Sequence, residues 1–266
     1  MEPRSARGLE AVLRRDRAIT LVALATVVGL AWRYLWQVAA SIDDSGMGMG
    51  MGTAAAAAAA GGGSTTGWPL SFAMWVIMMA GMMLPSAAPA ILAYGSLVRR
   101  NGERGGDLPT NAWCFALGYI VVWVVFSAAA ALLQRVLEQQ ALLTPMLASA
   151  STRLGALALI AAGVWQLTPV KRACLARCRS PLTFFVTRWR PGIAGALRMG
   201  IEHGASCVGC CWALMMLLFV AGVMNLMWVA AIAAFVFIEK IAPAGDLTSR
   251  VAAAALILYG AYALAV

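Results

Sequence analysis

Long apolar stretches separated by short polar segments make up most of the chain. A stretch of about 20 apolar residues can cross a bilayer as a helix, which satisfies its own backbone hydrogen bonds there. The pattern therefore predicts an all-α, polytopic transmembrane helix bundle with about seven spans. Five spans are expected near residues 18–40, 69–98, 112–133, 154–170 and 250–266. Residues 207–238 are too long for one crossing, and a break at Gly222–Asn225 is expected to divide them into two spans.

The N-terminal part of the chain differs in composition from the rest. Its first apolar stretch follows a basic segment, as in a signal peptide, but it continues through Trp32, Tyr34 and Trp36 without a small-residue cleavage site. We expect a retained helix, and cleavage would leave six spans. Residues 41–67 are of low complexity and predict a flexible linker. The expected organisation is therefore residues 1–67, with this helix and linker, followed by a six-helix transmembrane domain at 68–266.

Basic residues are distributed unevenly among the segments that join the spans. Seventeen of the twenty lysines and arginines lie in the N-terminal segment and in every second segment after it, whereas residues 41–67 contain none. Because lysine and arginine are enriched on the cytoplasmic side, this distribution predicts an N-in, C-out orientation. The formal net charge is +9, but in so apolar a chain these residues are expected to face anionic lipid rather than nucleic acid.

Five of the six cysteines lie in two groups that this topology places at the inner face of the membrane. Cys174 and Cys178 follow the fourth span, and Cys207, Cys210 and Cys211 open the fifth. Clustered cysteines on a reducing side are typical of metal ligands or redox-active thiols rather than of disulfides. Packing of cysteine as a small apolar side chain is the alternative.

The only histidine, His203, lies four residues before Cys207. In a helix, Met199, His203, Cys207, Cys211 and Met215 would form a stripe that winds slowly round one side. Thiolates with an imidazole suit Cu(I), zinc or an iron–sulfur cluster. The alternative is a histidine that only hydrogen-bonds. We expect Met199 and His203 in or near the preceding loop, at about residues 171–200, and Met215 near the middle of the bilayer.

Methionines are concentrated in two further places. In the second span, Met78 and Met82 share one helical line with Met74, and Met79 and Met83 lie beside it. These side chains are expected either to fill gaps in the core or to ligate a soft metal. The linker carries Met47, Met49 and Met51 in MGMGMG, which is either an exposed thioether site for Cu(I) or slack low-complexity sequence.

Sequence signatures of several enzyme classes are absent. The chain has no glycine-rich phosphate loop and no paired histidines of the H-E-x-x-H type. A single histidine cannot serve several acid–base roles. Metal ligation without catalysis is therefore the simpler interpretation, although enzymatic activity stays open.

Several blocks of the sequence resemble bacterial predicted metal-binding integral membrane proteins, a family long classed as of unknown function. The similar blocks are WVIMMAGMMLPSAAPAILAY, QLTPVKRACLARCRSPL, RWRPGIAGALRMGIEHGASCVGCCWALMMLLFVAGVMN and FIEK, which together span roughly residues 68–262. The resemblance implies metal binding, a multi-pass location in the bacterial inner membrane and a loose link to copper supply for copper enzymes. By position it singles out Met78, Met79, Met82, Met83, Cys174, Cys178, His203, Cys207, Cys210 and Cys211.

The leading hypothesis is an integral membrane protein that handles copper as a Cu(I) chaperone or in Cu(I) transfer across or at the inner membrane, with zinc or an iron–sulfur cluster as other options. Its expected metal ligands are those ten residues and Met215, and its expected partners are the lipid bilayer and a copper enzyme or periplasmic copper protein. A membrane thiol-redox protein that cycles its cysteines is the second hypothesis. The third is a structural or assembly subunit of a membrane complex, in which the cysteines only pack.

Overall fold

The computed structural model describes residues 3–46, 67–100, 108–143, 151–242 and 245–265. The regular elements of these residues are helices, and no strand occurs among them, which confirms the predicted all-α class. The helices are α1 (Pro3–Gly46), α3 (Gly67–Arg100), α4 (Leu108–Gln139), α5 (Thr152–Leu167), α6 (Pro169–Arg179), α7 (Pro181–Arg188), α8 (Gly192–Met216), α9 (Leu218–Ala221), α10 (Leu226–Ile241) and α11 (Gly245–Ala265). Met47, Met49 and Met51 lie outside the described residues.

Five helical segments are long and apolar enough to cross a membrane, which fits a membrane protein. They are Arg17–Ala40, Gly67–Val98, Asn111–Gln139, Gly192–Ala221 and Gly245–Ala265. A sixth span results if α5 and α6, which meet at a bend of 65°, are taken as one broken span. Helix α10 has 16 residues, or about 24 Å at the usual rise, so it is short for a crossing. The count of seven spans and their orientation stay predictions.

The expected loop at about residues 171–200 is wrong, because this segment is largely helical. It contains α6, α7 and the first turns of α8, so the fifth span begins at Gly192 instead of near Cys207. Helices α6 and α7 each begin with a proline at the first position, where a missing N–H is harmless. The chain turns into α8 at Gly192, whose φ of +77° favours glycine.

The predicted break at Gly222–Asn225 is confirmed. Helix α9 ends at Ala221, and Gly222 follows with a φ of +97°. The Asn225 side chain then caps α10 by accepting a hydrogen bond from the backbone N–H of Trp228 at 3.2 Å. The positive φ of Gly222 and the Asn225 cap thus allow a turn between α9 and α10 inside an otherwise apolar stretch.

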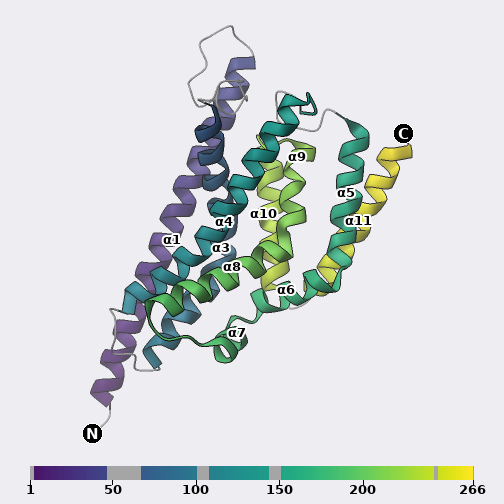
Figure 1. Ribbon diagram of the computed structural model, residues 1–266. Coiled ribbons are helices and arrows are strands. Elements are labelled where there is room, and N and C mark those ends of the chain that lie inside the picture. Colours follow the sequence, from purple (N-terminus) through teal and green to yellow (C-terminus); the bar gives the residue numbers. More distant parts are fainter. Residues whose placement is uncertain (1–2, 47–66, 101–107, 144–150, 243–244, 266) are drawn as a thin grey trace.

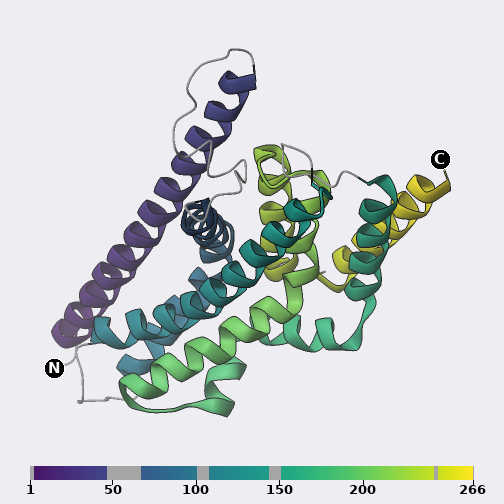
Figure 2. The same ribbon diagram turned by 45° about the horizontal axis from the view of Figure 1, so that its top comes forward.

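Helices α4 and α8 pack side by side through the middle of the molecule, while α5 and α11 form a pair to one side (Figures 1 and 2). The contact between α4 and α8 depends on glycines. A Cβ atom on Gly118 would lie 2.2 Å from the backbone oxygen of Leu197, and one on Gly200 would lie 2.1 Å from that of Phe115. Only glycine permits such an approach, which brings the side chains of α4 against those of α8.

Replacing Gly200 with alanine is expected to destabilise the protein by about 1–3 kcal/mol, because the added methyl group meets backbone that has to move. Unfolding of the detergent-solubilised protein measures the loss. Gly29→Ala on α1 is the matched control, since a Cβ there meets nothing within 4 Å. Equal losses in the two variants would contradict the close packing of α4 and α8.

Candidate metal centre

One buried face of α8 carries the predicted stripe of potential ligands. Met199, Cys211 and Met215 are fully buried, Cys207 is 1% exposed and His203 is 3% exposed. The four-residue spacing thus predicted a common face correctly. The expectation that Met199 and His203 lie in or near a loop was wrong, because α8 begins at Gly192 and places both inside the packed helix.

Cys207 is the centre of this face because side chains from two other helices converge on its sulfur. The Nζ atom of Lys240, on α10, lies 2.9 Å from the Cys207 Sγ atom. The hydroxyl group of Tyr119, on α4, lies 3.1 Å from the same sulfur. Lys240 also donates to the Ser86 hydroxyl of α3 at 2.9 Å. A cationic donor this close favours the thiolate form, which is the form that ligates metals.

The other cysteines of α8 surround the same point. The thiols of Cys210 and Cys211 each donate to the backbone oxygen of Cys207 at 3.0 Å. This bonding to the preceding turn holds both sulfurs close to the helix in a buried setting. The predicted Cys207, Cys210 and Cys211 group therefore occupies a single buried site.

Helix α6, which carries the second cysteine pair, packs against α8. Cys178 is half-buried and packs against the core that contains Cys207 and Cys210. Cys174 lies against Gly209 of α8, where a Cβ atom would be only 2.8 Å from the Cys174 Sγ atom. Gly209 is held from the other side by Trp165, whose Nε1 donates to its backbone oxygen at 3.3 Å.

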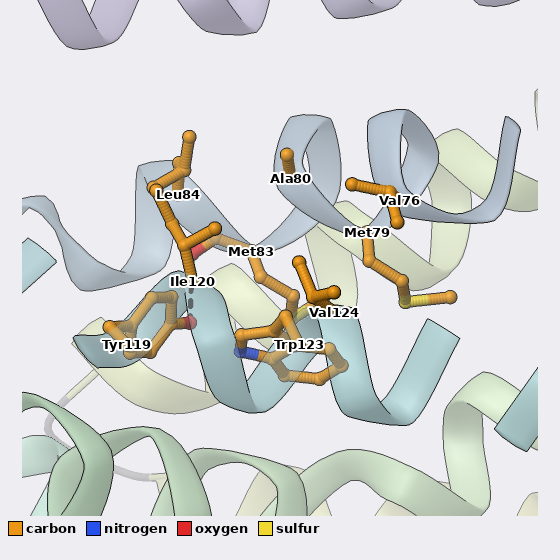
Figure 3. Close-up of a pocket in the computed structure, with 9 residues that line it drawn as sticks. All are labelled: Val76, Met79, Ala80, Met83, Leu84, Tyr119, Ile120, Trp123 and Val124. Atoms are coloured by element: carbon orange, nitrogen blue, oxygen red, sulfur yellow. Dashed lines mark hydrogen bonds between the residues drawn. The ribbon is translucent and has the colours of Figure 1, made fainter. Parts of the chain in front are cut away.

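One methionine of α3 lies next to the cysteines of α8. The Cys211 Sγ atom is 4.0 Å from the Met83 Sδ atom. Met78, Met79, Met82 and Met83 are all at most 2% exposed. Met79 and Met83 also line a small cavity of about 10 Å³ between α3 and α4, together with Tyr119 and Trp123 (Figure 3). This volume admits about one water-sized sphere.

Tyr119 joins the methionine cavity to the cysteine site. Its ring lines the cavity, and its hydroxyl group lies 3.3 Å from the backbone oxygen of Met83, as the dashed line in Figure 3 marks. The same hydroxyl group contacts Cys207. The Tyr119 hydroxyl group thus contacts both the backbone of Met83 and the sulfur of Cys207.

His203 lies one turn before Cys207 in an aromatic setting. Its ring centre is 5.8 Å from those of Phe115 and Phe184 and 6.1 Å from that of Tyr119. Its Nδ1 atom is buried and has no hydrogen-bond partner among the described residues. An unpaired buried nitrogen is costly unless something binds it, so this atom is available to a ligand.

No group of three or more histidine, cysteine, aspartate and glutamate side chains within the described ranges is already arranged to hold a metal ion. A thiol and a thioether from different helices do approach each other, in the mixed pair of Cys211 and Met83. Their distance of 4.0 Å allows both sulfurs to reach one ion with bonds of roughly 2.3 Å. A methionine sulfur and a cysteine sulfur therefore lie side by side at this candidate centre.

Sequence reasoning missed Lys240 and Tyr119 as parts of this site. It also missed the buried pair of Lys171, on α6, and Glu239, on α10, which hydrogen-bond to each other and to Ser249. Charged residues inside an apolar helix are themselves a signal of function, and Glu239 and Lys240 end such a segment. The partners of the two lysines could not be read from the sequence.

A family model described as "PpoB2: Copper chaperone" matches residues 72–263. This match covers well over half of the chain, including each of the helices that contribute to the site. Neither the curated proteins nor the solved structures contain a significant match.

Proposed function

The chain belongs to the PpoB2 family of copper chaperones, and from this premise we propose that it holds Cu(I) among the sulfur atoms around Cys207 and passes it on. The convergence of Cys207 and Cys211 on α8 with Met83 on α3 carries the proposal. Thiolates and thioethers are soft ligands, and Cu(I) is the common soft ion that both accept.

The buried charge also favours a monovalent ion. One Cu(I), two thiolates and the ammonium group of Lys240 have a net charge of zero, which suits a site excluded from water. A zinc ion with the same groups leaves a buried positive charge, and zinc prefers four ligands in a tetrahedron. Lys240 therefore contributes selectivity without touching the metal.

Replacing Lys240 with methionine is expected to weaken Cu(I) binding about tenfold to 100-fold, because a charged hydrogen bond to the thiolate contributes roughly 1.5–3 kcal/mol. Competition with a chromophoric Cu(I) chelator measures the change. Lys240→Arg keeps the charge and should retain most of the affinity. An equal loss of Cu(I) affinity in both variants would indicate that the shape of the Lys240 side chain, and not its charge, determines Cu(I) binding.

The methionines supply a path toward the cysteines. Copper that reaches the cavity beside Met79 and Met83 meets thioethers first and then Cys211, 4.0 Å beyond Met83. Thioethers bind Cu(I) without carrying a charge, so an ion leaves them readily for a thiolate. Transfer between two kinds of sulfur fits a chaperone better than a single closed cage does.

Met83→Leu is expected to lower the affinity for Cu(I) about tenfold, since the side chain keeps its volume and loses its sulfur. Met74→Leu is the control, because Met74 is equally buried on α3 and does not line the cavity. Chelator competition measures both variants, and a loss of the same size in Met74→Leu would remove Met83 from the ligand set.

The arrangement of the helices supports an N-in, C-out orientation. The start of α1 lies at the same end of the molecule as α6 and α7, whereas the end of α11 lies at the opposite end with α9 (Figure 1). The basic helix α6 and Arg188 at the end of α7 would then face the cytoplasm of a bacterium. The donor or acceptor is proposed to be a copper enzyme or a periplasmic copper protein.

Metal titration of the purified, full-length protein tests the proposal. Under reducing conditions we expect tight binding of Cu(I), with Zn(II) bound more weakly and displaced by Cu(I). Elemental analysis of the protein after dialysis gives the stoichiometry. Zinc bound more tightly than copper, or no copper retained against a moderate chelator, would overturn the proposal.

A thiol-redox function is the second candidate, because Lys240 lies beside Cys207 and all six cysteines are free thiols. Cys178, on the neighbouring helix α6, packs against the same core as Cys207 and is the candidate partner for a disulfide. Counting thiols in metal-free protein after mild oxidation and after reduction separates the two candidates. A reversible loss of two thiols supports redox cycling, and an unchanged count supports metal handling alone.

A further inference from the structure

A second cavity, of about 180 Å³, lies away from the cysteines, where α5 ends, α6 begins and α11 starts. It is lined by Gln166, Leu167, Arg172, Asp246, Ser249 and Arg250. None of these residues contributes to the candidate metal centre. The cavity has an exposed rim formed by Arg172, Asp246 and Arg250 and a buried floor formed by Gln166 and Ser249.

The floor contains a buried amide with no partner. Gln166 is 2% exposed, and neither its Oε1 nor its Nε2 atom makes a hydrogen bond within the described part of the chain. Leaving both atoms unpaired costs roughly 1–3 kcal/mol for each. An amide in this position offers one acceptor and two donors to whatever occupies the cavity.

The rim is positively charged. Arg172 and Arg250 have no ion-pair partner among the described residues, whereas Asp246 lies 3.8 Å from the Arg179 Nη1 atom. Behind the floor, the charges of Lys171 and Glu239 offset each other, and Ser249 is hydrogen-bonded to both. The unbalanced charge therefore belongs to the two arginines, whose planar guanidinium groups match phosphate oxygens.

The surroundings of the rim are apolar. Leu167 and Val170 on one side, and Leu247 and Val251 on the other, are about half exposed or more. These side chains flank the end of the α5–α11 pair, where a helix end would meet a membrane surface. A ligand with both a phosphate and acyl chains satisfies the arginines and the apolar flanks together.

We infer that this cavity binds the head group of a phospholipid, with its phosphate on Arg172 and Arg250 and a hydroxyl or amine of the head group on the Gln166 amide. The head group must carry a hydrogen-bond donor, because the Gln166 Oε1 atom accepts. Phosphatidylglycerol meets this requirement and phosphatidylcholine does not. Copper binding uses other residues, so either function can fail without the other.

Native mass spectrometry of the full-length protein in detergent tests the inference with added dioleoyl phosphatidylglycerol. We expect wild-type protein to retain this lipid at least about tenfold better than the R172Q/R250Q variant. The R135Q/R153Q variant removes two exposed arginines from α4 and from the opposite end of α5, and should bind like wild type. Equal retention by the two double variants would overturn the inference.

The Gln166→Leu variant tests the floor separately, because leucine fills the same space without polar atoms. It is expected to lose the preference for phosphatidylglycerol over phosphatidylcholine. An unchanged preference would contradict the role of Gln166. The last measurement adds inorganic phosphate in place of lipid. Phosphate binding at this cavity without lipid retention would overturn the lipid assignment. An unchanged unfolding transition of each detergent-solubilised variant shows that it has folded.

Discussion

Replacing Cys207 with serine is expected to weaken Cu(I) binding more than 100-fold, close to the loss produced by replacing all five cysteines of α6 and α8. The change removes the sulfur on which Lys240 and Tyr119 converge. It also leaves the Lys240 ammonium group buried without an anionic partner, so a positive charge opposes the incoming ion. The loss of a ligand and the unpaired charge of Lys240 therefore both weaken Cu(I) binding in this one variant.

The affinity of the Cys207→Ser variant for Cu(I) is measured by chelator competition, with Cys114→Ser as the control. Cys114 is half-buried on α4 and packs against the core outside the sulfur cluster. Its replacement should leave copper binding unchanged.

Cys210→Ser is informative in a different way, because its thiol only donates to the Cys207 backbone oxygen in this structure. A larger loss in Cys210→Ser than in Cys207→Ser would move the centre of the site by one turn.

The sequence predicted which candidate ligands share a face of α8, because spacing along one helix determines this. Residues four apart on α8 do share a buried face, and α6 packs against α8 with Cys174 beside Gly209. The meeting of α6 and α8 followed from topology, since both were expected at one membrane surface. Metal ligation by these side chains stays a prediction that the titrations test.

The residues that tune the site were not predictable, because they come from helices distant in sequence. Lys240 is 33 residues from Cys207, and Tyr119 is 88 residues away. Nothing in their local patterns indicates a common partner. The segment at 171–200 was misread for another reason. Its arginines reduce the local apolar character, although Arg172, Arg177 and Arg188 lie on the exposed side of helices whose buried side carries Lys171, Leu175 and Phe185.

The buried pair of Lys171 and Glu239 leads to the largest expected change in stability. Both side chains are at most 1% exposed, and Ser249 accepts a hydrogen bond from the Lys171 ammonium at 3.0 Å. Replacing Lys171 with methionine leaves a buried carboxylate whose second oxygen already has no partner among the described residues. Breaking such a pair costs about 3–5 kcal/mol in the free energy of unfolding.

The K171M/E239L double variant distinguishes charge from packing at this pair. Replacing both ions by apolar side chains of similar size is often neutral or stabilising, so the double variant should regain most of what K171M loses. Unfolding of the detergent-solubilised proteins measures both losses, and Cu(I) titration of the double variant shows whether α10 still presents Lys240 to Cys207. A double variant as unstable as K171M would contradict this expectation. It would mean that the two side chains hold α6 against α10 by shape and by the Ser249 contact, and that their opposite charges contribute little.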